Sequence, residues 1–151
     1  MKEFSTTVRI AAPATRVWQV LSDIERWHEW TPSVTSIHRL RDAPLEVGLR
    51  VLIRQPKLPP AMWTLTAIEA GRSFTWVSGM PGLQVVGEHA VEPDGSGSRA
   101  TLTLRYRGVL GDPLARLTRG ITERYVAYEG RGLKARSEDP SFRHDGVHEP
   151  R

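Results

Sequence analysis

The feature that most constrains the fold is a series of short β-rich segments between residues 33 and 108, separated by turn signals. The segments are SVTSIHRL (33–40), LRVLIRQ (49–55), AMWTLTAIEA (61–70), RSFTWVSG (72–79), LQVVGEHAVE (83–92) and SRATLTLRYRG (98–108). The connections DAPLEVG, PKLPP, AG, MPG and PDGSGS are rich in residues that favour turns. Because connections this short join antiparallel strands, the pattern predicts an antiparallel meander.

The last of these segments shows which side of the sheet is covered. Ala100, Leu102, Leu104 and Tyr106 fall on one face, while arginines and threonines fall on the other. One apolar and one polar face are typical of an antiparallel sheet that is covered on a single side. The β-branched segment EFSTTVRI (3–10) predicts a further strand, which makes seven in total.

Helical patterns lie before and after the meander. Pro13 marks a helix start, and Val17, Leu21 and Ile24 recur at helical spacing, followed by a second short helix in IERWHEW. Near the other end, residues 112–135 predict one long helix. Its expected apolar stripe consists of Leu114, Leu117, Ile121, Tyr125 and Tyr128. Gly120, Gly130 and Gly132 are unusual inside a helix, and they permit a bend or a close approach to the sheet.

Composition excludes several classes of protein. The chain has no cysteine, so disulfides and thiolate metal sites are impossible, and we expect neither a metal nor a cofactor. The net charge is +4, but the arginines are scattered, which is not typical of a nucleic-acid binder. No apolar run is long enough to span a bilayer, and the start lacks the apolar centre of a signal peptide. We therefore expect a cytoplasmic protein, monomer or homodimer, with no nucleic-acid or membrane partner.

The stretch IAAPATRVWQVLSDIERWHEW (10–30) resembles the opening of the START-like superfamily, in its polyketide cyclase/dehydrase and lipid transport branch. The resemblance extends weakly through AGRSFTW and HAVEPDGSGSRATLT. It implies an α+β helix-grip domain over residues 1–136: a seven-stranded antiparallel sheet curled around a long C-terminal helix, with two short helices after strand 1. Residues 137–151 lack periodicity and are rich in charge, Pro and Gly, so we expect a disordered tail without a role in ligand binding.

Family members bind lipids, polyketides, sterols or quinones in a cavity between the sheet and the helix. The resemblance and the aromatic content together favour binding of a small apolar molecule, aromatic or polyketide- or lipid-like. One alternative is a cyclase or dehydratase that uses His89 and Tyr106 as acid and base. A second is an interaction module for a protein or a quinone-bearing partner, with the loop RQPKLPPAM (54–62) as its contact surface.

Six residues are candidates for the wall of such a cavity. Apolar-face positions predict that His89, Tyr106, Tyr125 and Trp76 point inward, and the resemblance adds Trp27 at the pocket. With Trp63 on the strand beside Trp76, the predicted ligand-binding residues are Trp27, Trp63, Trp76, His89, Tyr106 and Tyr125.

The sequence also departs from the cyclase pattern that the resemblance implies. Val34 stands where aromatase/cyclases carry a tyrosine. The strand with Thr64 and Thr66 lacks the expected arginine, which would stabilise an enolate-like oxygen. These differences argue against the same chemistry.

Overall fold

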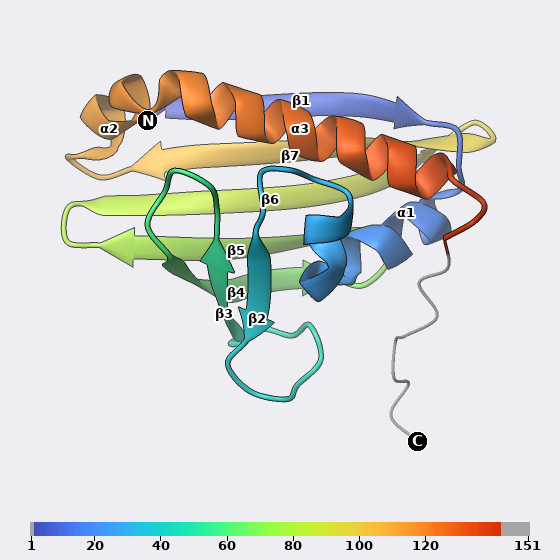
Figure 1. Ribbon diagram of the computed structural model, residues 1–151, viewed down its shortest axis with the longest axis horizontal. Coiled ribbons are helices and arrows are strands. Elements are labelled where there is room, and N and C mark those ends of the chain that lie inside the picture. Colours follow the sequence, from blue (N-terminus) through green and yellow to red (C-terminus); the bar gives the residue numbers. More distant parts are fainter. Residues whose placement is uncertain (1, 143–151) are drawn as a thin grey trace.

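The computed structural model describes residues 2–142 and contains a seven-stranded sheet with helices on one face (Figure 1). The strands are β1 (Lys2–Ile10), β2 (Ser36–Arg39), β3 (Arg50–Arg54), β4 (Ala61–Glu69), β5 (Ser73–Met80), β6 (Leu83–Asp94) and β7 (Gly97–Arg107). The helices are α1 (Ala14–Ser22), the 3₁₀ helix η1 (Ile24–Glu29), α2 (Gly111–Leu117) and α3 (Arg119–Glu138).

The sheet order is β1-β7-β6-β5-β4-β3-β2, and every neighbouring pair is antiparallel. The meander therefore runs from β2 to β7, and β1 joins it at the edge of β7. The long helix α3 crosses the concave side and packs mainly on β1 and β7 (Figure 1). The predicted α+β helix-grip architecture is confirmed, including the two short helices after the first strand.

The expectation of one unbroken helix over residues 112–135 is wrong, because the chain bends at Thr118 between α2 and α3. The Thr118 hydroxyl donates to the Leu114 carbonyl at 2.8 Å, and such local bonds compete with regular helix geometry. The predicted stripe is shifted as well. Leu117 is 82% exposed, and the buried face of α3 consists of Thr122, Val126, Gly130, Leu133, Arg136 and Ser137.

The small residues on that face explain the shift. A Cβ atom at Gly130 would lie 2.9 Å from Thr6 Cγ2, and one at Gly132 would lie 2.0 Å from the Trp30 carbonyl oxygen. The helix backbone therefore lies directly on β1 and on the segment after η1. Close approach confirms the role expected for these two glycines, whereas Gly120 has open space beside it.

The interior is divided into two apolar clusters. The large one joins α1, η1 and the middle of the sheet, and it includes Trp27, Phe74 and Leu102. The small one lies under α2 and contains Leu83, Tyr106 and Ala115. The half-buried side chains of Val85 and Leu104 contact both clusters, so they mark the place where the two cores meet.

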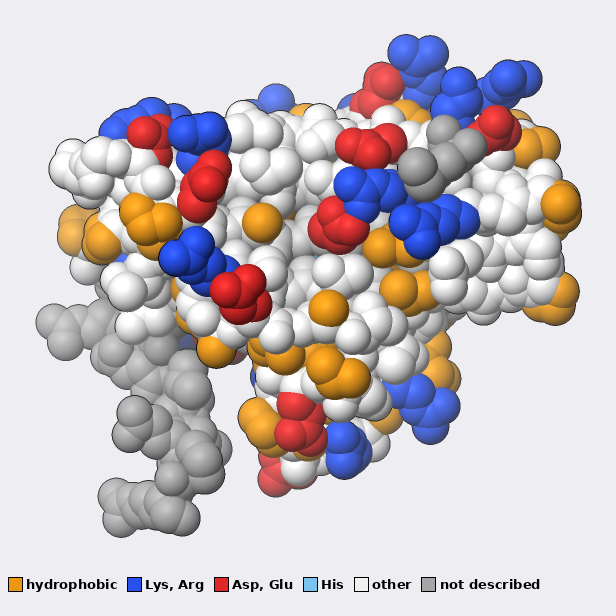
Figure 2. All heavy atoms as spheres, turned by 180° about the vertical axis from the view of Figure 1, so that it is seen from behind, with side chains coloured by type: hydrophobic (Ala, Val, Ile, Leu, Met, Phe, Trp, Pro, Cys, Tyr) orange, Lys and Arg blue, Asp and Glu red, His pale blue; other side chains and the backbone are white. Residues whose placement is uncertain are grey.

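The opposite face of the sheet is polar, and basic and acidic side chains lie beside one another on it (Figure 2). Arg105 forms ion pairs with Glu3 and Glu88 across three strands. Hydroxyls of Ser5 and Thr103 form a cross-strand hydrogen bond at 3.2 Å. Within residues 2–142 no helix covers this face, as the alternation in β7 predicted.

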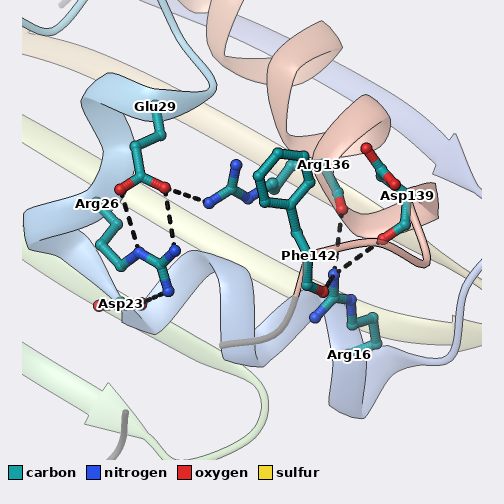
Figure 3. Close-up of polar contacts among 7 residues, drawn as sticks. All are labelled: Arg16, Asp23, Arg26, Glu29, Arg136, Asp139 and Phe142. Carbon is teal, nitrogen blue, oxygen red and sulfur yellow. Dashed lines mark hydrogen bonds and ion pairs between the residues drawn. The ribbon is translucent and has the colours of Figure 1, made fainter. Parts of the chain in front are cut away.

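The domain boundary expected at residue 136 falls inside the last turn of α3, which continues to Glu138. The Arg16 guanidinium donates to the carbonyl oxygens of Asp139 and Phe142, and the Arg136 guanidinium lies 3.8 Å from the centre of the Phe142 ring (Figure 3). Residues 137–142 of the expected tail therefore contact the body of the domain. The rest of that segment, 143–151, lies outside the described residues.

Candidate functional site

The concave side of the sheet carries a cluster of stacked and tilted aromatic rings. Trp76 lies within contact distance of four others, with ring centroids 5.2 Å from Phe74, 5.4 Å from Trp27, 6.1 Å from Trp63 and 5.0 Å from His89. Trp27 comes from η1, Trp63 from β4, Trp76 from β5 and His89 from β6. The structure thus brings together four of the six predicted site residues.

His89 is held in one protonation state by this cluster. Its ring stacks on Phe74 at 4.3 Å, and Nδ1 donates to the Phe74 carbonyl oxygen at 3.3 Å, which places the proton of the neutral ring on Nδ1. Burial lowers the pKa of His89 to about 4. The imidazole is therefore neutral near pH 7, with Nε2 as a hydrogen-bond acceptor, and it is not a general acid there.

Tyr106 and Tyr125 lie away from the aromatic cluster. His89 is opposite Leu102 in the β6–β7 register, and Tyr106 is four residues further along β7, roughly 13 Å away. The Tyr106 hydroxyl is bonded to Thr122 Oγ1 at 3.1 Å in the small core. Tyr125 donates to the Pro56 carbonyl oxygen and so ties α3 to the 54–62 loop. His89 and Tyr106 are not placed to act as an acid–base pair.

Two indole N–H groups in the interior have no hydrogen-bond partner among the described residues. They belong to Trp63 and Trp30, whereas the Trp27 indole donates to the Leu21 carbonyl oxygen at 3.0 Å. Buried N–H donors are nearly always paired, so an unpaired one indicates a bound water or an acceptor supplied by a ligand. These two groups are thus hydrogen-bond donors that the described residues leave unused.

Three hydrogen-bonded polar side chains, which were not predicted from the sequence, lie where α3 crosses the segment after η1. The Ser33 hydroxyl donates to Glu129 Oε1 at 3.2 Å and is 2.8 Å from the Thr31 hydroxyl. Thr31 and Ser33 are fully buried, whereas the Glu129 side chain keeps part of its surface accessible. Burial raises the pKa of Glu129 to about 7, so both of its protonation states are populated near neutral pH.

Glu129 is one helical turn from Tyr125 and shares its side of α3. The helix-grip arrangement therefore adds a carboxyl group to an interior that is otherwise apolar and aromatic. A signal for this position exists in the sequence, because Glu129 lies three residues from Val126 and four from Leu133, at the border of the buried face.

The raised pKa of Glu129 makes stability depend on pH. The folded state holds this proton more tightly than the unfolded chain, so the free energy of unfolding decreases as pH rises from about 4.5 to about 7. Replacing Glu129→Gln is expected to stabilise the protein above this window and to have little effect below it. Urea unfolding at about pH 5 and about pH 8 measures the difference.

The control for this prediction is Glu123→Gln, an exposed substitution on the same helix. It is expected to leave the pH dependence unchanged. Equal pH profiles for the wild type and Glu129→Gln would show that Glu129 titrates normally.

Among the described residues 2–142, no group of histidine and acidic side chains is arranged to hold a metal ion. The hydrogen-bonded side chains of Thr31, Ser33 and Glu129 provide one carboxylate and two hydroxyls, which is also a poor ligand set for a transition metal. The site therefore consists of an aromatic wall, two unpaired indole donors and one carboxyl group.

Solved structures show that this architecture is shared. A protein from Thermus thermophilus superposes with a TM-score of 0.71 at 20% identity, over 90% of this chain and 97% of that one. The Streptomyces aromatase/cyclase Zhui superposes with a TM-score of 0.75 at 18% identity, over 97% of this chain and 99% of that one. A START superfamily protein from Mycobacterium smegmatis superposes with a TM-score of 0.67 at 14% identity, over 88% of this chain and 97% of that one. At these identities the likeness is one of fold.

Among curated proteins, no sequence matches the chain significantly. The family model described as polyketide cyclase / dehydrase and lipid transport matches residues 1–138, which spans both cores and the whole of α3. The resemblance of the 10–30 stretch is thus confirmed over nearly the full chain. The chain belongs to the polyketide cyclase / dehydrase and lipid transport family.

Proposed function

We propose that the protein binds a small, largely apolar molecule, aromatic or polyketide- or lipid-like, between the sheet and α3. The observation that carries the proposal is the partial accessibility of Val85 and Leu104, whose side chains face inward where the two cores meet. Well-packed interiors rarely leave inward-facing aliphatic side chains accessible. A ligand in contact with these residues would bury them.

The polar groups of the interior suggest how such a molecule is oriented. Trp63 and Trp30 each offer an unpaired N–H donor, and Glu129 offers a carboxyl group with a pKa of about 7. Apolar pockets commonly use a few placed polar groups of this kind to orient a ligand. An apolar molecule with a carbonyl or hydroxyl group fits this set better than a pure hydrocarbon.

The test is saturable binding of a hydrophobic dye, anilinonaphthalene sulfonate, followed by its own fluorescence. Val85→Trp adds bulk where the two cores meet and is expected to weaken dye binding about tenfold or more, equivalent to about 1.4 kcal/mol. Val47→Trp, at an exposed position in the loop before β3, is the matched control and should leave binding unchanged. Equal affinity in the wild type and Val85→Trp would refute binding at this place.

A cyclase or dehydratase activity is the second candidate, favoured by Glu129 and its bond to Ser33. A carboxyl with a pKa near the working pH can act as a general acid or base. Glu129→Gln separates the two functions: a binding protein would keep most of its dye affinity in this variant. An enzyme acting on a polyketide-like substrate would lose turnover by roughly 10²–10⁴-fold.

A further inference from the structure

The end of the molecule formed by α2 and the β5–β6 hairpin exposes four large apolar side chains. Val109 is 84% exposed, Leu117 82%, Met80 63% and Leu110 47%. These four residues, here called the α2 tip, are half of the eight large apolar side chains that are exposed within the described chain. Figure 2 shows hydrophobic side chains at this end, on the right, beside basic ones.

The residues of the α2 tip come from separate segments but form one surface. The Leu110 amide donates to the Gly82 carbonyl oxygen at 2.9 Å, which fixes the start of α2 against the hairpin that carries Met80. A Cβ at Gly82 would lie 3.3 Å from side-chain atoms of both Val109 and Leu110. Leu110 directly precedes α2 and Leu117 ends it, and a spacing of seven residues places them on the same side of the helix, about two turns apart. The tip therefore joins Val109 and Leu110 to the hairpin of Met80, with Leu117 on the same side of α2.

Three arginines lie on the segments next to this patch. Arg107 ends β7, Arg116 lies on α2 and Arg124 lies on the first turns of α3. Within residues 2–142 none of these three arginines forms an ion pair, whereas Arg119 pairs with Glu123. Asp112 is the one acidic residue of α2, so the arginines give this end an excess of positive charge. An apolar tip beside such an excess suits a surface that is apolar below and negative above.

We propose that the α2 tip docks on the surface of a lipid bilayer that contains anionic lipids. Leu117, Val109 and Met80 would enter the boundary between headgroups and acyl chains, and Arg107, Arg116 and Arg124 would face the negative headgroups. In such an arrangement, the burial of apolar area and the attraction between basic residues and anionic headgroups both favour binding. This docking is independent of the ligand site proposed above.

A second copy of the chain fits the tip less well. Face-to-face association would bring two sets of arginines together, and juxtaposed like charges oppose association. A lipid surface supplies both the apolar layer and the opposite charge.

No helix among the described residues is long and apolar enough to cross a bilayer. The sequence-based expectation of no membrane partner rested on the lack of a spanning run. Docking at the membrane surface needs only a few apolar and basic side chains, so the lack of a spanning run does not exclude it.

The test is sedimentation of the full chain with vesicles of phosphatidylcholine, with and without phosphatidylglycerol. Wild type is expected to bind the vesicles that contain phosphatidylglycerol. The double variant Val109→Asn with Leu117→Asn should bind about tenfold more weakly, as should Arg116→Gln with Arg124→Gln. The matched controls are Val47→Asn and Arg72→Gln, exposed positions away from α2, which should bind like wild type.

Three results would overturn the proposal. The first is a wild type that binds neither kind of vesicle. The second is equal weakening by the tip and the control substitutions. The third is a wild type that binds no vesicles but self-associates in analytical ultracentrifugation, with the self-association lost in the Val109→Asn, Leu117→Asn variant. That result would identify the tip as a dimer contact. Unchanged thermal unfolding of the variants shows that they remain folded.

Discussion

Replacing Gly132 by alanine is expected to lower the free energy of unfolding by roughly 3 kcal/mol. An added Cβ would lie 2.0 Å from the Trp30 carbonyl oxygen and 3.0 Å from the Trp30 ring atom Cε3. The first of these atoms belongs to the backbone, so it cannot move aside by a change of rotamer. Either α3 or the segment after η1 must shift, and both belong to the wall of the proposed site.

The matched control is Gly120→Ala, in the first turn of the same helix, where an added Cβ meets nothing within 4 Å. Because alanine favours helix over glycine, this variant should be as stable as the wild type or more stable by up to about 1 kcal/mol. Urea unfolding compares the two variants. If both substitutions have the same effect, the close contact between α3 and Trp30 does not exist in solution.

Removing residues 137–151 is the second change with a large expected effect, roughly 2 kcal/mol of stability, or about 4–8 °C in Tm. The truncation deletes Ser137, which is buried, and Glu138, whose Oε2 accepts from the Ala11 amide and from Lys134, each at 2.7 Å. It also deletes carbonyl oxygens that accept from Arg16 (Figure 3). These groups join the end of α3 to the start of α1.

The control chain ends after Phe142 and keeps all of these contacts, so it should unfold at nearly the wild-type temperature. Differential scanning calorimetry of the three chains measures the difference. A chain that ends at Arg136 and melts with the wild type would show that residues 137–142 add nothing to stability.

The strand meander could be predicted well because the physical signals are local. The alternation in SRATLTLRYRG and the turn residues around it predicted a strand over 98–108, and β7 spans Gly97–Arg107. Period-2 patterns of this kind require no knowledge of the rest of the fold. The resemblance of the 10–30 stretch then supplied the helix-grip.

The face of α3 was not predicted, because the strongest apolar residues were assumed to mark the contact. Thr122 and Gly130 form it instead, and small residues produce no hydrophobic periodicity. Leu117 was assigned to the core for the same reason and lies at the exposed α2 tip.

Most of the candidate site also depends on distant contacts. Ser33 and Glu129 are 96 residues apart in the chain, so no local pattern links them. Likewise, no sequence pattern predicts that the Trp27 indole N–H donates to the Leu21 carbonyl oxygen, whereas the Trp63 indole N–H has no hydrogen-bond partner among the described residues. Such pairings follow only from the packing of α1, η1 and α3 on the sheet.

The most direct test of ligand binding follows the tryptophan indole N–H signals by heteronuclear NMR during titration with anilinonaphthalene sulfonate. The account predicts saturable shifts of the Trp63 and Trp30 signals, since these buried N–H groups lack a partner among the described residues and would pair with an oxygen of the ligand. The Trp27 signal should change least, because its N–H is bonded to the Leu21 carbonyl oxygen at 3.0 Å. Dye binding that leaves the Trp63 and Trp30 signals unchanged would contradict a site between the sheet and α3.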